Sequence, residues 1–324
     1  MMWQTCWQLH WEQAVQSGSK NSSISNAIQG RVCMFKRVAI VGTGLIGGSM
    51  GLALRQAKAA QQVAGYDGEK GVSDRARKAG AIDQSCSSLA DAVRGAELII
   101  LATPVGAMRS LLHQLATLAA PGAVVTDVAS TKVQVISWAE EYLPPAIAFV
   151  GGHPIAGKEA SGVEAADAQL FRQCVYCLTP TRRTAPAALE KVSTLIDALG
   201  ARTRFLEPQE HDGMVAGVSH LPFIASSVLM QSVAGSEAWD DTAQLAGNGF
   251  RDMTRLAAGS PEMYRDICLT NSEAITRWLE DYITALNALR ERIAAHDSSL
   301  GEVFSQAQKL RRDWQASLEN QKHE

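Results

Sequence analysis

The sequence has little of what marks several classes of protein. It contains no run of about eighteen apolar residues, so no membrane-spanning helix is expected. Its 30 basic and 33 acidic side chains give a net charge of -3, which provides neither a basic surface for nucleic acid nor a polybasic membrane anchor. These absences favour a protein whose partner is a small molecule.

The six cysteines among the 324 residues follow no regular spacing. In a chain of this length they indicate reduced thiols in a cytoplasmic protein rather than a disulfide framework. Cys174 and Cys177 form a Cys-x-x-Cys pair, but the pair lies in a strand-like run, where residues three apart point to opposite faces. No second such pair exists, so we predict neither a metal site nor a redox pair here.

Length and composition predict a folded protein of about two domains. Hydrophobic residues make up 46% of the chain and charged residues 19%, a mixture typical of globular proteins. Residues 1–33 differ from the rest, because they combine clustered tryptophans with a Ser/Asn-rich stretch. Since Met34 directly precedes the first convincing strand, we expect residues 1–33 to be a disordered extension without a secretory signal; the alternative is a short surface helix over 3–15.

Residues 34–207 alternate short apolar runs with amphipathic segments of helix length, the pattern of repeated βα units. We therefore predict an α/β fold with a Rossmann-type, doubly wound, mainly parallel sheet. The expected strands cover 37–41, 63–66, 97–102, 123–126, 146–150, 175–179 and 203–206.

Residues 208–324 are predicted to form an all-helical domain. We expect a long apolar helix over 209–235, interrupted at Pro222, and one long helix over 263–295 that follows the start signal Ser260-Pro261. In the latter, apolar residues recur at steps of three and four from Ile275 to Ile293 and form a stripe too wide to leave in water. Either the last helix of the chain or a second subunit could cover this stripe.

The first motif with chemical meaning is Gly42-Thr-Gly44-Leu45-Ile46-Gly47, between the first strand and a helix. In such a loop the first glycine permits a tight turn, the second lets the backbone approach a pyrophosphate, and the third lets helix and strand pack closely. The N-terminus of the following helix attracts negative charge. The motif therefore predicts a dinucleotide site that includes Leu45 and Ile46.

An acidic residue follows this motif at the end of the second expected strand. The Asp67 carboxylate can accept hydrogen bonds from ribose hydroxyls and would repel a 2′-phosphate, so NAD is favoured over NADP, although Lys70 nearby weakens that preference. Thr103 and Pro104 end the next buried strand and are predicted to form a wall beside the cofactor. The alternative is that Thr103 and Pro104 only terminate the strand.

Three further motifs occur in order along the chain: Gly151-Gly-His-Pro-Ile-Ala-Gly157, Ser161-Gly-Val-Glu-Ala-Ala-Asp167 and Gly249-Phe-Arg-Asp-Met-Thr-Arg255. Over about 35–271 the sequence resembles the prephenate/arogenate dehydrogenase family. The resemblance implies an NAD(P)-binding Rossmann domain joined to a helical dimerisation domain, and hence a homodimer. It also implies oxidative decarboxylation of prephenate or arogenate in tyrosine biosynthesis. Some family members carry a C-terminal regulatory domain, for which we expect no room here.

That reaction requires a base for the ring hydroxyl, a clamp for the carboxylate and a hydride acceptor. His153 follows an expected strand on the nicotinamide side, and the pKa of a free histidine suits a general base near neutral pH. The resemblance implies the same catalytic role. Ser130, at the neighbouring strand end, could orient the imidazole and contact the substrate hydroxyl, or it could cap the helix that follows. Both readings of Ser130 can hold together.

For substrate binding, Arg251 offers a planar guanidinium suited to a carboxylate; the alternative is an ion pair at the domain junction. His220 lies beside Pro222 and is expected in the substrate pocket, with a satisfied core histidine as the alternative. Many relatives have His-Leu-Pro-His at this place, whereas Phe223 here removes the second histidine. We expect His211 and its neighbour Asp212 to be structural.

The resemblance and these residues together imply an NAD-dependent prephenate dehydrogenase that yields 4-hydroxyphenylpyruvate and that could also use arogenate. One alternative is an arogenate-specific enzyme that yields tyrosine. The β-hydroxyacid dehydrogenase class would require a catalytic lysine where Ser219 and His220 stand. A non-catalytic Rossmann protein that senses NAD would be expected to lose its base, whereas His153 and Arg251 are both present.

Overall fold

The computed structural model of this protein describes residues 34–158 and 160–323, so the extension expected over 1–33 lies outside the described residues. These residues form two compact units, one up to Ser272 and one from Glu273 onward. The predicted functional boundary after residue 207 differs from this division and stays a prediction. Helices α9 (Pro208–Val215) and α13 (Pro261–Thr270) pack on the helices that cover the sheet, which explains why they belong to the first unit.

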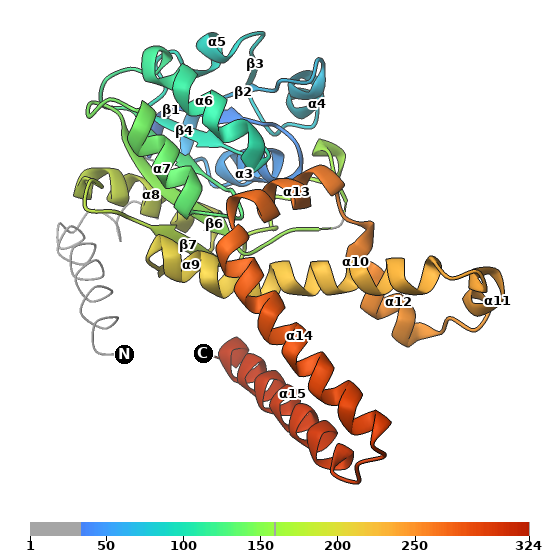
Figure 1. Ribbon diagram of the computed structural model, residues 1–324. Coiled ribbons are helices and arrows are strands. Elements are labelled where there is room, and N and C mark those ends of the chain that lie inside the picture. Colours follow the sequence, from blue (N-terminus) through green and yellow to red (C-terminus); the bar gives the residue numbers. More distant parts are fainter. Residues whose placement is uncertain (1–33, 159, 324) are drawn as a thin grey trace. The chain divides into compact units, whose positions relative to one another are not determined.

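The first unit is built on an eight-stranded sheet with the order β3-β2-β1-β4-β5-β6-β7-β8 (Figure 1). Its first six strands are parallel, in the order of a dinucleotide-binding Rossmann sheet, and β7 runs antiparallel to β6. The strands are β1 (Phe35–Val41), β2 (Ala60–Tyr66), β3 (Gln84–Ser85), β4 (Leu98–Leu101), β5 (Val124–Asp127), β6 (Ala148–Pro154), β7 (Val175–Thr179) and β8 (Arg202–Phe205). The predicted α/β fold with a mainly parallel sheet is confirmed.

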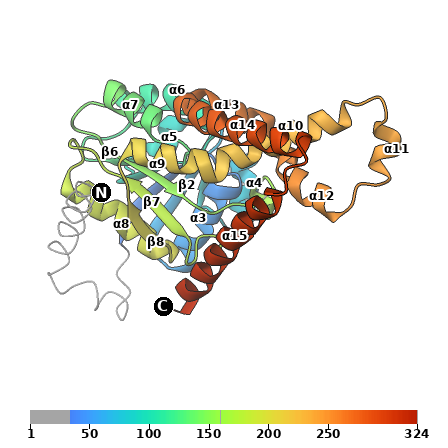
Figure 2. The ribbon, with the colours of Figure 1, turned by 60° about the horizontal axis from the view of Figure 1, so that its bottom comes forward.

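Helices cover both faces of the sheet (Figure 2). In β1, Val38 and Ile40 pack with the core on the side of α3 and α8, whereas Ala39 and Val41 face the opposite core. This alternation follows from the two-residue period of a strand, and burial on both faces explains why the strands are apolar throughout. The helices involved are α3 (Leu45–Gln56), α4 (Val72–Lys78), α5 (Leu89–Val93), α6 (Val105–Leu118), α7 (Val133–Tyr142) and α8 (Pro186–Leu199).

Two strand assignments from the sequence need correction. The two-residue strand β3 was not predicted, because so short a segment carries no periodic signal. Strand β6 was expected to end at Val150 but continues through Pro154. Its first part pairs with β5, and its second part pairs with the antiparallel β7, with His153 opposite Cys177. His153 therefore lies on a strand that extends beyond the end of β5.

After β8 the chain is helical. The predicted interruption near Pro222 is a π-helical segment over Ala216–His220, between α9 and α10 (Leu221–Ala234). The expected single helix over 263–295 is wrong, because Asn271 separates α13 from α14 (Ser272–Ala294). The remaining helices are α11 (Trp239–Ala243), α12 (Asn248–Thr254) and α15 (Leu300–His323).

The segment Pro208–Ala234 has 27 residues and contains an 18-residue window with a mean hydropathy of 1.5, long and apolar enough to cross a membrane by length and composition alone. One such helix is weak evidence for a membrane span, so the expectation that none exists stays a prediction. Core helices of other proteins pass the same test. Here the α9 part is tied into the first unit, since His211 and Asp212 are buried and hydrogen-bonded to residues of β6 and α7.

Candidate active site

The glycine loop follows β1 and has the geometry of a dinucleotide cradle. At Gly42, which has a φ of +90°, a Cβ would overlap the carbonyl oxygen of Ala102 on the neighbouring strand end. A Cβ at Gly47 would overlap the carbonyl oxygen of Gly42. A Cβ at Gly44, in contrast, would meet nothing within 4 Å. Packing therefore requires two of the glycines, and the third leaves space over the backbone for a ligand.

This open glycine also precedes the N-terminus of α3. Leu45 and Ile46 are the first two residues of the helix, and no side chain caps its N-terminus. Free backbone N–H groups at a helix start favour an anion. The loop thus fits a pyrophosphate, and its residues are those the sequence predicted.

Of the three other predicted cofactor residues, Asp67 and Thr103 lie against the same loop. Asp67 follows β2, and its carboxylate accepts hydrogen bonds from the backbone N–H of Thr43 at 2.8 Å and of Glu69 at 3.0 Å. Thr103 lies against the loop, because a Cβ on Gly42 would be 2.8 Å from its Cγ2. Pro104 is exposed and stands at the N-terminus of α6.

His153 is the centre of a group of histidines and charged side chains at the far end of β6. It is half-buried, and its Nδ1 lies 2.9 Å from Nε2 of His211 on α9. Nδ1 of His211 in turn lies 2.8 Å from Oδ1 of Asp212. The sequence predicts His211 and Asp212 to be structural and gives no sign of this contact, because only the packing of α9 against the sheet brings them to His153.

A buried ion pair holds the backbone beside His153. Lys132 and Asp127 are both fully buried and hydrogen-bonded to each other. Lys132 Nζ also donates to the carbonyl of Gly152 at 2.7 Å, while Asp127 accepts from the N–H of Gly152 at 3.0 Å. Burial lowers the pKa of Lys132, and the nearby Asp127 opposes that shift. Both backbone groups of the residue before His153 are therefore fixed.

The environment keeps His153 uncharged. Its pKa lies well below the usual value for histidine, first because the ring is desolvated and then because His211, Lys132 and His220 disfavour a charge on the ring. A histidine that is neutral at physiological pH has a lone pair with which to accept a proton. The arrangement is suited to general-base chemistry.

Ser130 lies between β5 and α7 and is half-buried. Its alternative role as the helix cap is wrong: α7 begins at Val133, and the Asp212 carboxylate accepts from the backbone N–H of Lys132 at 2.7 Å and of Val133 at 2.9 Å. In the part of the chain that the structure describes, no hydrogen bond joins Ser130 to His153. Its predicted contact with the substrate hydroxyl stays a prediction.

His220 is 2% exposed and ends the π-helical segment. Its Nδ1 lies 3.3 Å from Nδ2 of Asn271, the residue that separates α13 from α14. Burial lowers the pKa of His220 to about 4; Asp212 opposes this shift and His211 adds to it. The structure therefore brings His220 into the same group of side chains as His153, in a buried position.

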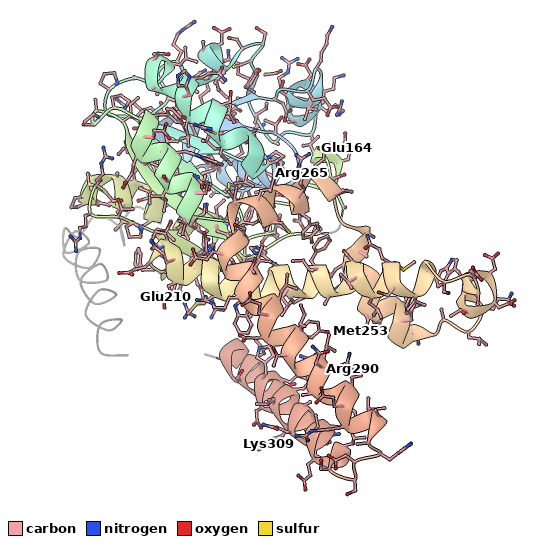
Figure 3. All side chains as sticks on the ribbon, viewed as in Figure 1. Glu164, Glu210, Met253, Arg265, Arg290 and Lys309 are labelled. Atoms are coloured by element: carbon pink, nitrogen blue, oxygen red, sulfur yellow. The ribbon has the colours of Figure 1, made fainter. Side chains whose placement is uncertain are left out.

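Arg251 is not brought to this group within the single chain. It lies on α12, which packs on α10 and on the turn that follows; Figure 3 labels Met253 on the same helix. Its side chain is 75% exposed and lies 3.8 Å from Asp252. Among the described residues, no hydrogen bond or ion pair links Arg251 to His153.

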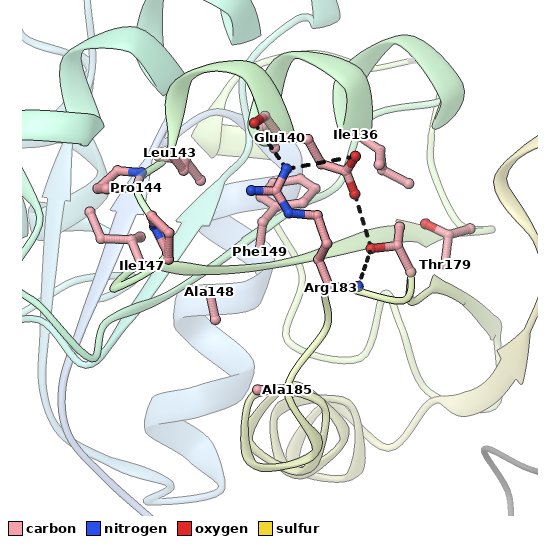
Figure 4. A pocket seen from close by; sticks show the side chains of 13 residues that line it. Ile136, Glu140, Leu143, Pro144, Ile147, Ala148, Phe149, Thr179, Arg183 and Ala185 are labelled. Carbon is pink, nitrogen blue, oxygen red and sulfur yellow. Dashed lines mark hydrogen bonds and ion pairs between the residues drawn. The ribbon is translucent and has the colours of Figure 1, made fainter.

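A pocket of ≈ 160 Å³ lies elsewhere, where β6 starts and β7 ends (Figure 4). Its polar groups form hydrogen bonds with one another: Arg183 donates to the Glu140 carbonyl at 3.1 Å, and Thr181 donates to the Glu140 carboxylate at 3.1 Å. His153 does not line it. We therefore take the carboxyl end of the parallel strands, with the glycine loop and His153, as the candidate active site.

Comparisons with known proteins find relatives over both parts of the chain. The family model described as "Prephenate dehydrogenase, nucleotide-binding domain" matches residues 50–205, and "Prephenate dehydrogenase, dimerization domain" matches 207–306. The prephenate dehydrogenase of Bacillus subtilis is 35% identical over 85% of this chain and 75% of its own length. The cyclohexadienyl dehydrogenase of Zymomonas mobilis is 35% identical over 86% of this chain and 96% of its own.

Solved structures of prephenate and arogenate dehydrogenases are also similar to this chain. The prephenate dehydrogenase of A. aeolicus, in complex with hydroxyphenyl propionate and NAD+, superposes with a TM-score of 0.81 and 31% identity, covering 86% of this chain and 98% of the other. The arogenate dehydrogenase of Synechocystis superposes with a TM-score of 0.73 and 31% identity, covering 86% of this chain and 99% of the other. On its fold, its glycine loop and these similarities, the chain belongs to the prephenate dehydrogenase family.

Proposed function

We propose that this protein is an NAD-dependent prephenate dehydrogenase that converts prephenate to 4-hydroxyphenylpyruvate and CO2. The observation that carries the proposal is the uncharged His153, half-buried beyond the end of β5, in the same sheet whose glycine loop fits a pyrophosphate. The relatives named as prephenate dehydrogenases support the substrate.

His153 acts as the general base. Its ring nitrogen accepts the proton of the 4-hydroxyl group of prephenate as C4 becomes a carbonyl carbon. NAD+, when bound, supplies the acceptor for the hydrogen that leaves C4 with its electron pair. Loss of the ring carboxylate as CO2 then restores the aromatic ring. Ser130, at the neighbouring strand end, is proposed to hold the same hydroxyl group.

Gly42, Gly44, Leu45, Ile46 and Gly47 are proposed to hold the pyrophosphate. Asp67 is proposed to bind the adenosine ribose and to select NAD over NADP by repelling a 2′-phosphate. Thr103 and Pro104 would form the adjoining wall, which their position beside the glycine loop supports.

Arg251 and His220 are proposed as substrate-binding residues. The guanidinium of Arg251 is exposed and, among the described residues, makes only a long ion pair with Asp252, so it is available for a carboxylate. His220 is uncharged and lies among the groups that shape the potential at His153.

A homodimer is proposed as the working assembly, in the cytoplasm. The helical residues match a family model described as a dimerization domain. In addition, α10, α14 and α15 expose large apolar side chains, among them Val228 at 55%, Leu286 at 48% and Trp314 at 55%. The free thiols of Cys86, Cys174, Cys177 and Cys268 support a reducing compartment.

The test is NADH formation by the purified protein with prephenate and with arogenate, each with NAD+ and with NADP+. We expect turnover of prephenate with NAD+, and a loss of about 10²-fold or more in kcat for His153→Asn. Faster turnover of arogenate would favour the activity named for the Synechocystis relative. A folded protein that binds NAD+ but turns over neither substrate would contradict the proposal and favour an NAD-sensing protein.

A further inference from the structure

The base proposed above is the end of a hydrogen-bonded series of three side chains. Nδ1 of His153 lies 2.9 Å from Nε2 of His211, and Nδ1 of His211 lies 2.8 Å from Oδ1 of Asp212. We propose that His211 and Asp212 are positioning residues that fix the tautomer of His153, so that its Nε2 carries no proton. The inference rests on the proposed function for its catalytic consequence, but not for its structural content.

Asp212 determines which atom is the donor in each hydrogen bond of the series. Its carboxylate accepts from the backbone N–H of Lys132 at 2.7 Å and of Val133 at 2.9 Å. A carboxylate that is held by two N–H donors acts as an acceptor. Nδ1 of His211 must therefore carry the hydrogen that it shares with Asp212.

The tautomer of His211 then determines the tautomer of His153. A neutral imidazole has one N–H and one lone pair, so a proton on Nδ1 of His211 leaves its Nε2 as an acceptor. The partner of that acceptor is Nδ1 of His153, which must then be the donor. As a result, Nε2 of His153 has the lone pair and faces no hydrogen-bond donor among the described residues.

Burial strengthens the preference for these two tautomers. His211 is fully buried and Asp212 is 2% exposed, so bulk water does not compete for their hydrogen bonds. The backbone carbonyl of Asp212 also accepts from Nδ2 of Asn271 at 2.9 Å, which fixes the start of the series to the end of α13. In a desolvated site a donor that faces another donor is costly, so the opposite tautomers are disfavoured.

The same series offsets the charge that His153 gains during the reaction. The groups around the ring are Lys132 and Asp127, which pair with each other, His220 and His211 from the helices, and Cys177, the register partner of His153 on β7. Of the two carboxylates, that of Asp127 is already paired with Lys132. Asp212, acting through His211, is the acid left to stabilise a protonated His153.

Two substitutions of His211 separate the contacts. In His211→Asn the amide can still reach Asp212, because it replaces Nδ1, but it is too short for His153. In His211→Gln the amide can replace Nε2 and still accept from His153. His113→Asn, at an exposed histidine on α6, is the matched control.

The first readout needs no substrate. In the ¹⁵N NMR spectrum of the histidine-labelled full chain, with His153→Asn used to assign the signals, we expect His153 as the Nδ1–H tautomer. We expect a mixture of tautomers in His211→Asn, and the wild-type state in His211→Gln and His113→Asn. An Nε2–H tautomer in the wild type, or an unchanged spectrum in His211→Asn, would overturn the inference.

The second readout is kinetic. For His211→Asn we expect kcat with prephenate to fall about 10- to 100-fold, with KM unchanged and the acid limb of the pH profile displaced; His211→Gln should regain most of the loss. Equal losses in both variants would indicate a merely structural role and contradict the inference. A wild-type protein without turnover but with the Nδ1–H tautomer would refute the proposed function alone.

Discussion

At the scale of the residue, burial decides the charge of the histidines. His220 is 2% exposed, and burial lowers its pKa to about 4, whereas histidine in an unfolded chain titrates near about 6.5. Above the unfolded pKa both states are neutral and the group contributes nothing to stability. As the pH falls from there toward the folded pKa, the unfolded chain binds the proton first, so stability is lost.

This difference predicts an acid-sensitive fold. Between neutral pH and a pH of about 5, His220 should remove about 2 kcal/mol from the free energy of unfolding. Urea unfolding of the wild type and of His220→Gln at both pH values tests this, because the variant should lose about 2 kcal/mol less on acidification. His113→Gln serves as the control and should behave like the wild type. Parallel losses in all three proteins would contradict the prediction.

Also at the residue scale, the glycines of the loop should differ in what they do. Gly44→Ala should leave the melting temperature unchanged, because a Cβ there meets nothing within 4 Å, but it should weaken NAD+ binding by occupying the space for the pyrophosphate. We expect a rise of about tenfold or more in the dissociation constant, equivalent to roughly 1.4 kcal/mol, by isothermal titration.

The matched change Gly47→Ala should lower the melting temperature, since its Cβ would overlap the carbonyl oxygen of Gly42. If Gly44→Ala bound NAD+ as the wild type does, the glycine loop would not be the pyrophosphate site.

At the scale of the element, one side chain separates two helices. The segment from α13 to α14 has the periodicity of a single helix, yet Asn271 adopts a non-helical backbone and its Nδ2 donates to the Asp212 carbonyl and lies 3.3 Å from His220 Nδ1. A buried amide that satisfies a carbonyl on another helix outweighs the preference of the chain to continue as a helix.

Asn271→Ala should therefore lower the free energy of unfolding by about 1–3 kcal/mol while leaving the helix content unchanged or higher, because alanine favours helix. Urea unfolding and far-UV circular dichroism measure the two quantities. Asn287→Ala, at an exposed position of α14, is the control and should not be destabilised. A variant as stable as the wild type would show that the break has another cause.

At the scale of the whole molecule, apolar helix surfaces remain exposed within the part of the chain that the structure describes. On α14, Ile283, Leu286 and Ile293 are 53%, 48% and 54% exposed, and on α15 Leu310 is 63% exposed. The sequence left open whether the last helix or a second subunit covers the stripe. Since these side chains remain exposed with α15 present, we favour the second subunit.

Leu286→Glu should then shift the protein from dimer to monomer, because burying a carboxylate in an apolar interface is costly. Sedimentation velocity at micromolar concentration measures the change. Asn287→Glu adds the same charge at the adjacent exposed position and should leave the dimer intact. A wild type that sediments as a monomer, or a dimer in both variants, would contradict the assembly or this interface.

Features with local signals could be predicted from the amino-acid sequence. Strand period, glycine spacing and strand-end polar residues predicted the parallel sheet, the cradle at Gly42, Gly44 and Gly47, and His153, because each depends on neighbours within one βα unit. Asp67, Thr103 and Pro104 were assigned to the cofactor from the same framework, and these roles stay predictions.

Features that depend on distant segments could not be predicted and are visible in the folded chain. The contact of His211 and Asp212 with His153 joins positions 58 residues apart through the packing of α9 on the sheet. The cap of α7 comes from Asp212 rather than Ser130, and the end of α13 is set by Asn271. Hydrogen bonds between buried groups act over space and not along the chain, so no periodicity in the sequence records them.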